Sequence, residues 1–416
     1  MLTTIIKKEI LENISSYKFT IIVLLSTVLI LTSLFIMVRD YQLRMENYEV
    51  LTPESNDPTA LVRPTPMSIF AKGLDENLCR SYRIRFGGQI EVGSKQQSVN
   101  AIFRLFTAPD LLFVIKVIMA LCAMLFAFDR ISGEKNDGTL KLSLSNSIGR
   151  PIVILGKWIG GFASLVVPFV LAVLVGSLFI ALSPQIGMDV KDWSRLLLFG
   201  LGAVCYTAVF FSLGLLISTV THRASSSLVI SLFVWSLLIF VLPNLGNILA
   251  RQIVQIPSVQ QLEVRRNHIW IKAVFDRIQG RIRGKEVVDT INRENDLLMA
   301  DYRSKFERLV NVSKNITRLS PASAFTFLAT DIAGTGLFEE NRVKQAVLQY
   351  KDQIFGTETD SDGNLLGQFP VFTYQRKSLG DVLNLETLGN FVILILFQLL
   401  FFSISYVSFL KYDVRS

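Results

Sequence analysis

The sequence predicts an all-α polytopic membrane protein with six transmembrane helices, an N-terminal interfacial helix, and a mostly helical extracytoplasmic domain with a small β-containing part. Half of the 416 residues are hydrophobic and only 18% are charged, against about 25% charged in soluble domains. The apolar residues cluster in runs of about 20, the length of helix that crosses a bilayer. This composition excludes a disordered or collagen-like chain, and three cysteines are too few for a disulfide scaffold.

Residues 1–18 precede the first span and are predicted to form an amphipathic helix on the membrane surface. Leu2, Ile6 and Ile10 recur at helical spacing. The polar face of this helix is made of Lys7, Lys8, Glu9 and Glu12. The alternative interpretation is that these residues only extend the first span.

Six apolar runs are long enough to be spans. The first has 20 residues without a charge, which cover about 30 Å at 1.5 Å per residue. It is longer than the hydrophobic region of a signal peptide and has no small-residue cleavage pattern, so we expect it to stay in the mature protein. The predicted spans are 19–38, 109–128, 158–182, 196–220, 224–249 and 388–410.

The short loops predict that both termini are cytoplasmic. Basic residues in short segments are concentrated on the side of the termini, whereas the short loop near 183–195 on the other side has two. The segments 39–108 and 250–385 are then extracytoplasmic, and 129–157 and the tail 411–416 are cytoplasmic. The net charge of +8 is scattered among acids without a basic stripe, so we expect no nucleic-acid partner.

The two external segments differ in their patterns. SYRIRFGGQIEV alternates apolar and basic residues before a Gly-Gly pair, which predicts a β-hairpin. Residues 250–385 have three apolar stripes that predict antiparallel helices packed on one another. GTETDSDGNLLG is interpreted as a solvated turn, since it lacks the glycine and glutamate of a calcium-binding EF-hand. The stripes are Ile271, Phe275, Ile278 and Ile282; Tyr302, Phe306 and Val310; and Val343, Val347, Tyr350 and Ile354.

Residues for covalent chemistry are scarce. The two histidines, His222 and His268, are predicted on opposite sides of the membrane, so they cannot share a metal site. The chain has no HExxH, CxxC, GxSxG or GxxxxGK[ST] motif. We therefore expect no enzyme and no cofactor in this chain, and any use of ATP would require another polypeptide.

Three residues are candidates for a translocation path. Lys116 is the one deep charge in the spans, and its ammonium either reaches the outer headgroups or faces a bundle interior where it attracts an anionic group. Pro168 and Pro243 interrupt spans three and five. The break at Pro243 suits a gate or a simple exit from the bilayer. The lack of acids in the spans disfavours an ion-coupled carrier.

The loop at 129–157 is the most informative stretch, because it is too polar for lipid and too short for a domain. It contains a short leucine-rich segment after Gly138, which could form a helix at the cytoplasmic surface. Its charges could face a soluble partner. These charges are Asp129, Arg130, Glu134, Lys135 and Asp137.

This loop resembles that of the permease subunits of ABC-2 type transporters, in which E-x-x-x-G-T-L is followed by an Arg and L-G-K. The resemblance implies that Glu134 to Ser145 is a coupling helix that docks into a separate ATP-binding subunit, and that residues 1–18 are the interfacial helix of the family. It also implies an ATPase-coupling site. The residues assigned to that site are Asp129, Arg130, Glu134, Asp137, Gly138, Thr139, Leu140, Arg150 and Lys157.

The stretches RPTPMSIFAKGLD and RLSPASAFTFLATDIAGTG resemble the subgroup with large extracytoplasmic domains, to which sodium-export and copper-enzyme maturation permeases are similar. The resemblance implies ATP-driven export across a bacterial inner membrane by two permease copies or paralogues, with ATP and Mg in the partner subunit. It leaves the cargo open. The alternative on the same scaffold is a mechanotransmission or envelope-assembly module, in which 250–385 binds an envelope protein.

Overall fold

The computed structural model describes residues 2–51, 58–84, 90–93, 109–145, 149–281, 283–355, 369–383 and 385–412. These residues are mainly helical, and the part of the chain that they cover has six helices long and apolar enough to cross a membrane, which confirms the predicted class. Two compact units are present, residues 1–236 with 324–416, and residues 237–323. The six helices are Tyr17–Leu51, Leu111–Asn136, Arg150–Ala181, Val190–Val220, Ala224–Ile253 and Leu385–Leu410.

The first unit begins with α1 (Leu2–Ile14), which a turn at residues 15–16 separates from α2 (Tyr17–Leu51). α1 packs along α9 (Arg150–Ala181), and two glycines of α9 allow this close approach. A Cβ at Gly156 would lie 2.5 Å from the side chain of Ile5, and one at Gly160 would lie 2.7 Å from that of Glu9. Small residues in the contact therefore bring the two helices together.

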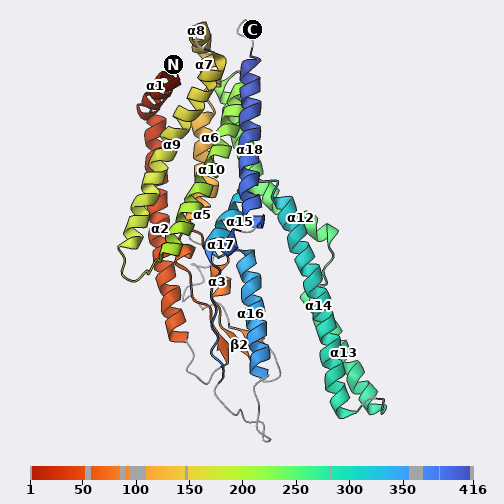
Figure 1. Ribbon diagram of the computed structural model, residues 1–416. Helices are drawn as coiled ribbons and strands as arrows, with labels where there is room; N and C mark the ends of the chain where they lie inside the picture. The colour runs from red at the N-terminus through yellow and green to blue at the C-terminus, as the bar shows by residue number, and fades with distance from the viewer. Residues whose placement is uncertain are drawn as a thin grey trace. The chain divides into compact units, whose positions relative to one another are not determined.

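α10 (Val190–Val220) lies at the centre of the membrane part of this unit. It packs against α6 (Ala120–Ala127) and α18 (Leu385–Leu410), and most of its second half is buried. Figure 1 shows α2, α9, α10 and α18 running alongside one another, with both chain termini at one end, together with α7 (Ser132–Asn136) and α8 (Thr139–Ser145). We call this the terminal end, and the other the distal end. The remaining elements of the membrane part are α5 (Leu111–Phe113), η2 (Val114–Met119) and α11 (Ala224–Ser236).

The distal end holds a small antiparallel sheet in the order β1-β2-β3. The predicted hairpin is present, because β2 and β3 pair with Tyr82 opposite Val92; its Gly-Gly turn lies outside the described residues. The strands are β1 (Thr59–Ala60), β2 (Tyr82–Ile84) and β3 (Ile90–Val92), and the short helices nearby are η1 (Pro66–Ile69), α3 (Asp75–Leu78), α15 (Pro321–Ala333) and α17 (Leu379–Val382).

The apolar stripe of α16 (Leu337–Phe355) packs against this sheet. We predicted that the stripe packs on another helix, and this prediction is wrong. Its four residues are buried in one core with side chains from the segment that follows α2, so the two segments predicted to be external share a core. The core consists of Ala60, Val62, Leu78, Ile84, Val343, Val347, Tyr350 and Ile354.

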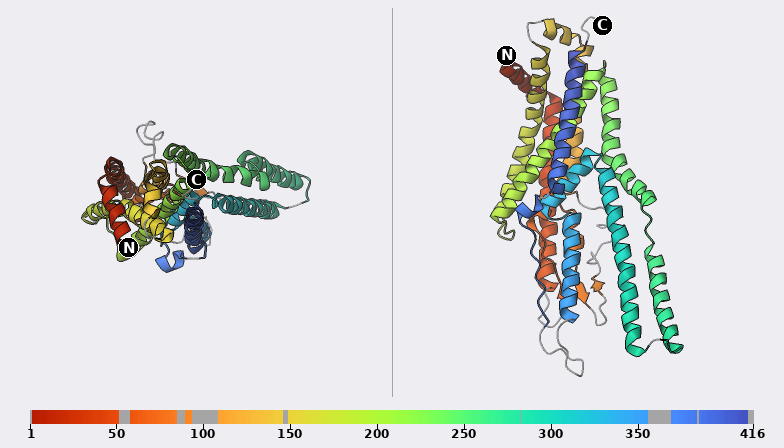
Figure 2. Two further views of the ribbon diagram at one scale, coloured as in Figure 1. Left: turned by 90° about the horizontal axis from the view of Figure 1, so that it is seen from above. Right: turned by 45° about the vertical axis from the view of Figure 1, so that its right-hand side comes forward.

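The second unit contains η3 (Leu237–Val241), α12 (Leu242–Ile253), α13 (Val259–Ile278) and α14 (Gly284–Thr317). α14 packs on both α12 and α13, and Figure 2 shows α13 and α14 as an antiparallel pair. Gly280, with a φ of +71°, lies in the turn between them. Proline has no backbone N–H, so Pro243 leaves one hydrogen bond of the helix unmade. The π-helical turn η3 directly precedes it. The predicted break at Pro243 is therefore wrong, because the helix continues to Ile253.

The predicted packing of the α13 stripe is also wrong. Ile271, Phe275 and Ile278 are more than half exposed, and α13 buries Leu262 and Ala273 instead. The fourth member of that stripe, Ile282, and the predicted turn GTETDSDGNLLG lie outside the described residues.

Candidate functional site

The E-x-x-x-G-T-L stretch forms a tight turn between α7 and α8. Gly138 has a φ of +73°, which ends α7, and its N–H donates to the carbonyl of Lys135. Leu140, on the first turn of α8, is fully buried, and α8 packs on α7. The pattern therefore encodes a left-handed turn and an apolar contact next to the acidic side chain of Glu134.

Glu134 belongs to a buried ion cluster at the terminal end. The ammonium of Lys157 on α9 lies 2.7 Å from Glu134 Oε1 and 2.9 Å from Glu9 Oε1 of α1. Arg130 lies 3.5 Å from the other oxygen of Glu9. The side chains of Lys157 and Glu9 are 5% and 3% exposed. A single lysine thus connects α1, α7 and α9 in a site where the charges are removed from solvent.

Two other basic residues donate hydrogen bonds to carbonyls at the ends of helices. Lys135 Nζ donates to the carbonyls of Thr219 and Thr221 at the end of α10. Arg150 donates to the carbonyls of Leu410 and Tyr412 at the end of α18, at 2.7 and 3.0 Å. Cations satisfy the last carbonyls of a helix and favour its negative end. Lys135 therefore connects the loop between α6 and α9 to the end of α10, and Arg150 connects the start of α9 to the end of α18.

Most charges of the loop make contacts within the chain, and it stays a prediction that they face a soluble partner. Asp129 pairs with Lys18 at 2.8 Å, and Arg130, Glu134 and Lys135 are held as described above. Asp137 alone of the five predicted charges is classed as exposed. Glu9, predicted on the polar outer face of the first helix, is buried instead.

We expect the substitution Gly138→Ala to disturb the orientation of α8. A Cβ at this position would meet no atom within 4 Å, so the cost comes from the left-handed backbone and is about 1–2 kcal/mol. Gly133→Ala in α7 is the matched control, because its Cβ would make only an ordinary contact at 3.6 Å. Thermal unfolding of the two variants measures the difference, and equal unfolding temperatures would contradict the assignment of Gly138.

Lys116 lies on the π-helical segment η2, and its carbonyl is a hydrogen-bond acceptor. The hydroxyl of Tyr206 donates to this carbonyl at 2.6 Å, and the indole of Trp235 donates to that of Val117 at 3.3 Å. Among the described residues, the ammonium of Lys116 makes no ion pair within 4 Å. Pro168 lies inside α9. Nothing brings these residues into one site, so a translocation path remains a prediction.

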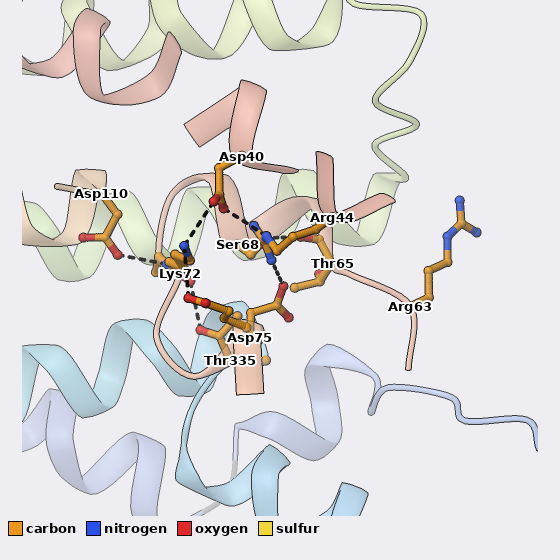
Figure 3. A network of polar contacts seen from close by, with 12 residues as sticks. Asp40, Arg44, Arg63, Thr65, Ser68, Lys72, Asp75, Asp110 and Thr335 are labelled. Atoms are coloured by element: carbon orange, nitrogen blue, oxygen red, sulfur yellow. Dashed lines mark hydrogen bonds and ion pairs between the residues drawn. The ribbon is translucent and has the colours of Figure 1, made fainter. Parts of the chain in front are cut away.

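A second ion network lies at the distal end and was not predicted. Asp75, which is fully buried, accepts from Arg44 of α2 and, at 2.8 Å, from Arg376 in the segment before α17. Asp40 pairs with Arg44 at 2.9 Å and with Lys72 at 3.1 Å. Figure 3 shows Asp40, Arg44, Lys72 and Asp75 converging from α2 and the segment that follows it. The network connects segments more than 300 positions apart in the sequence.

The same region explains the two stretches that resemble the subgroup with large external domains. Thr335 Oγ1 donates to the carbonyl of Ala71 at 2.9 Å, and the N–H of Leu74 donates to the carbonyl of Thr335 at 2.8 Å. The N–H of Lys72 donates to Asp110 at 2.9 Å, at the start of α5. The two stretches therefore pack on each other and on the end of a predicted span.

The environment of the network alters two nearby groups. Burial raises the pKa of the Cys79 thiol, and the Asp75 carboxylate raises it further, against the opposing effect of Arg376 and Arg44. Burial lowers the pKa of Arg376, but Asp75, Cys79 and Glu339 outweigh this and leave it above its usual value. A thiol with a raised pKa is mostly protonated at neutral pH, so we expect Cys79 to react slowly.

Among the described residues, no group of three or more His, Cys, Asp and Glu side chains is placed to hold a metal ion. The two clusters are ion pairs between acids and bases, without an accessible nucleophile and base at hydrogen-bond distance.

Comparison with known proteins agrees with this architecture. The sequence model of a family described as "ABC-2 family transporter protein" matches residues 3–414. The chain is also similar to a protein of Stutzerimonas stutzeri named "Probable ABC transporter permease protein NosY", with 34% identity over 131 residues. That alignment covers 30% of this chain and 45% of the relative, so the chain matches less than half of the relative's length.

Proposed function

The chain belongs to the ABC-2 transporter family, as a multi-pass permease subunit, and we propose that it couples ATP hydrolysis in a separate subunit to the export of a substrate. The observation that carries this proposal is the buried cluster of Glu9, Glu134 and Lys157. It connects a short surface helix to the helices that cross the membrane.

The exposed side of α8 is the proposed docking surface for the ATP-binding subunit. Leu142 is 70% exposed there, next to the exposed Lys141 and not far from Asp137. An exposed leucine flanked by charges is typical of the centre of an interface with a polar rim. Glu134, by contrast, holds α7 and α8 in place through Lys157.

The proposed mechanism follows from the ion pairs and hydrogen bonds that the region 129–157 makes with the membrane helices. Closure of two ATP-binding subunits around ATP and Mg would push α8, and Lys157 would pass this displacement to α1 and α9. Lys135 and Arg150 would pass it to the ends of α10 and α18. Packed helices then shift as rigid elements and open a path between two permease copies or paralogues.

The terminal end is, in this proposal, the cytoplasmic side of a bacterial inner membrane, and the sheet, α16 and the part of the second unit that follows residue 249 are extracytoplasmic. Lys116 and Pro168 are candidates for the path. Pro243 belongs to the same proposal, but as a residue inside a continuous helix. The cargo is an open part of the proposal.

We expect the substitution Leu142→Glu to abolish capture of the ATP-binding subunit, because a charge would be buried at the centre of the contact. The measurement is affinity purification of the tagged chain from its native membrane, followed by an ATPase assay of the eluate. Lys8→Glu, at an exposed lysine of α1, is the control and should keep the ATPase. Absence of an ATPase from the wild-type eluate would refute the proposed coupling.

The length of α14 favours a second candidate function on the same scaffold. Its 34 residues cover about 50 Å, more than a membrane span requires. A rod of this length can pass movement to an envelope protein without moving a solute. ATPase activity that persists in proteoliposomes without any solute flux would favour this module over export.

A further inference from the structure

Arg195 is a buried basic residue near the start of α10. It is 6% exposed and directly precedes the predicted span 196–220. The Nη2 group of its guanidinium donates to the carbonyl of Lys377. Its Nε is buried, and neither Nε nor Nη1 donates to an acceptor among the described residues. Only one of the three guanidinium nitrogens is therefore satisfied by that part of the chain.

The charge of Arg195 also lacks a carboxylate at ion-pair distance. Asp192 and Glu339 are close enough to act on it electrostatically, but no acid among the described residues lies within 4 Å of its guanidinium. The oxygens of Glu339 accept instead from Tyr374 at 2.8 Å and from Arg342 at 3.2 Å. Buried charges are normally paired, because burial removes their hydration without compensation. Arg195 is thus a group that can take its counterion from outside the chain.

Gly334 brings a second guanidinium group close to the first. It lies in the loop between α15 and α16, with a φ of +68°. A Cβ at this glycine would lie 3.1 Å from Arg195 Nη1 and 3.8 Å from Arg376 Nη1, which are the two nearest atoms. Arg376 Nη1 also donates to the carbonyl of Gly334. Two guanidinium groups therefore meet where the glycine has no side chain.

One oxyanion can connect two nitrogens placed in this way. The Nη1 atoms of Arg195 and Arg376 cannot be farther apart than the two distances to the Cβ position of Gly334 add up to. A carboxylate or phosphate group accepts N–H bonds of about 2.8 Å and, through two of its oxygens, connects donors up to about 8 Å apart. Asp75, which pairs with Arg376, is shared with Arg44. It therefore does not neutralise the two guanidinium groups at Gly334.

We propose that Arg195 and Arg376 form a binding site for an oxyanion, a phosphate or carboxylate group, between the start of α10 and the loop that contains Gly334. The bound group supplies the counter-charge of Arg195 and connects α10 to the segment before α17. Because Arg195 is buried, the site takes a single such group, either as a free ion or as the phosphate of a lipid headgroup. The proposal does not depend on coupling to ATP.

The test measures thermal unfolding of the full chain in dodecyl maltoside, in a buffer whose anion is a bulky sulfonate. Inorganic phosphate, added at constant ionic strength, should raise the unfolding temperature saturably by about 2 °C or more, because a ligand that binds the folded chain stabilises it. Isothermal titration calorimetry of the wild-type chain with phosphate measures binding directly. A rise with dioleoylphosphatidic acid and none with inorganic phosphate would support the same site with a lipid headgroup as its ligand.

Two variants with matched controls locate the effect. Arg195→Met removes the charge and should abolish the response, whereas Lys191→Met, at an exposed lysine of the same helix, should respond as the wild type does. Gly334→Ala places a methyl group 3.1 Å from Arg195 Nη1 and should weaken phosphate binding at least tenfold. Gly280→Ala is its control, because the backbone there has a similar φ of +71° but the Cβ would meet no atom within 4 Å.

Three results would overturn the proposal. Failure of the wild-type chain to bind either phosphate or phosphatidic acid would mean that water alone satisfies Arg195. An undiminished response in Arg195→Met, or undiminished binding by Gly334→Ala, would place the anion elsewhere on the chain. Calorimetry of the wild type needs no variant, so it tests the proposal even where a variant does not fold. Capture of an ATPase is measured separately, and failure of the anion site leaves the permease function intact.

Discussion

Replacing Lys157 with methionine should separate α8 from the membrane helices and abolish ATPase activity coupled to substrate. The substitution keeps the length of the side chain but removes the charge that lies between Glu9 and Glu134. Glu134 then has no cation within ion-pair distance among the described residues, and one of its oxygens is buried without a partner even now. Leaving a buried charge unpaired typically costs about 3–5 kcal/mol.

The measurements are the thermal unfolding of the purified chain and the substrate-stimulated ATPase activity of the reconstituted complex. Lys18→Met is the matched control, because Lys18 pairs with Asp129 where both side chains are about one-third exposed, and such pairs contribute about 1 kcal/mol or less. Lys157→Met with Glu134→Leu should recover most of the stability, since the uncompensated carboxylate is gone, but not the coupling. Full coupling in this double variant would contradict the role given to the cluster.

The membrane spans could be predicted from the sequence because transfer of apolar side chains into lipid depends on composition over about 20 residues. The ends of the spans could not be predicted from the sequence. α2 continues to Leu51, past the charges after residue 38, because Asp40 and Arg44 are held by the distal network. The helix likewise continues through Pro243, because Ser320 donates to the carbonyl of Leu238 and Asn244 donates to that of Phe240.

Periodicity predicted which helix faces are apolar but not what covers them. The stripes of α13 and α16 have the same 4 and 3 spacing, yet that of α16 is buried against the sheet and that of α13 is exposed. The partner of an amphipathic helix depends on contacts between distant parts of the chain. Such contacts leave no trace in a local pattern.

The candidate site also could be predicted from the sequence only in part. The resemblance assigned Glu134, Gly138 and Lys157 to a coupling site, which stays a prediction, and the structure shows the ion pair of Glu134 with Lys157 and the left-handed turn at Gly138. Glu9 was missed as a buried residue because lysines and another acid surround it in the sequence, which is typical of a solvated face. One feature of the sequence pointed to this burial. Glu9 follows Ile5 by one helical turn, and in the structure the side chains of both residues lie against glycines of α9.

The substitution Asp75→Asn should destabilise the distal end and expose Cys79 to modification. Asp75 is fully buried between Arg44 and Arg376, so its loss leaves two guanidinium groups without their shared carboxylate, at a cost of about 3–5 kcal/mol. The carboxylate also raises the pKa of Cys79, whereas the two arginines lower it. Removing the negative charge therefore lowers the thiol pKa, and the thiolate fraction at neutral pH rises.

The measurement is the rate of alkylation of Cys79 by a membrane-impermeant maleimide, in a chain whose other cysteines, Cys122 and Cys205, are replaced by alanine. The wild-type thiol should react slowly and Asp75→Asn at least tenfold faster at neutral pH. Glu76→Gln is the control at the adjacent position, because Glu76 is half exposed and pairs with Lys72 at 3.4 Å. If both variants react at the wild-type rate, the network around Asp75 does not hold the distal end together, and α2 must be held there by its packing on η1.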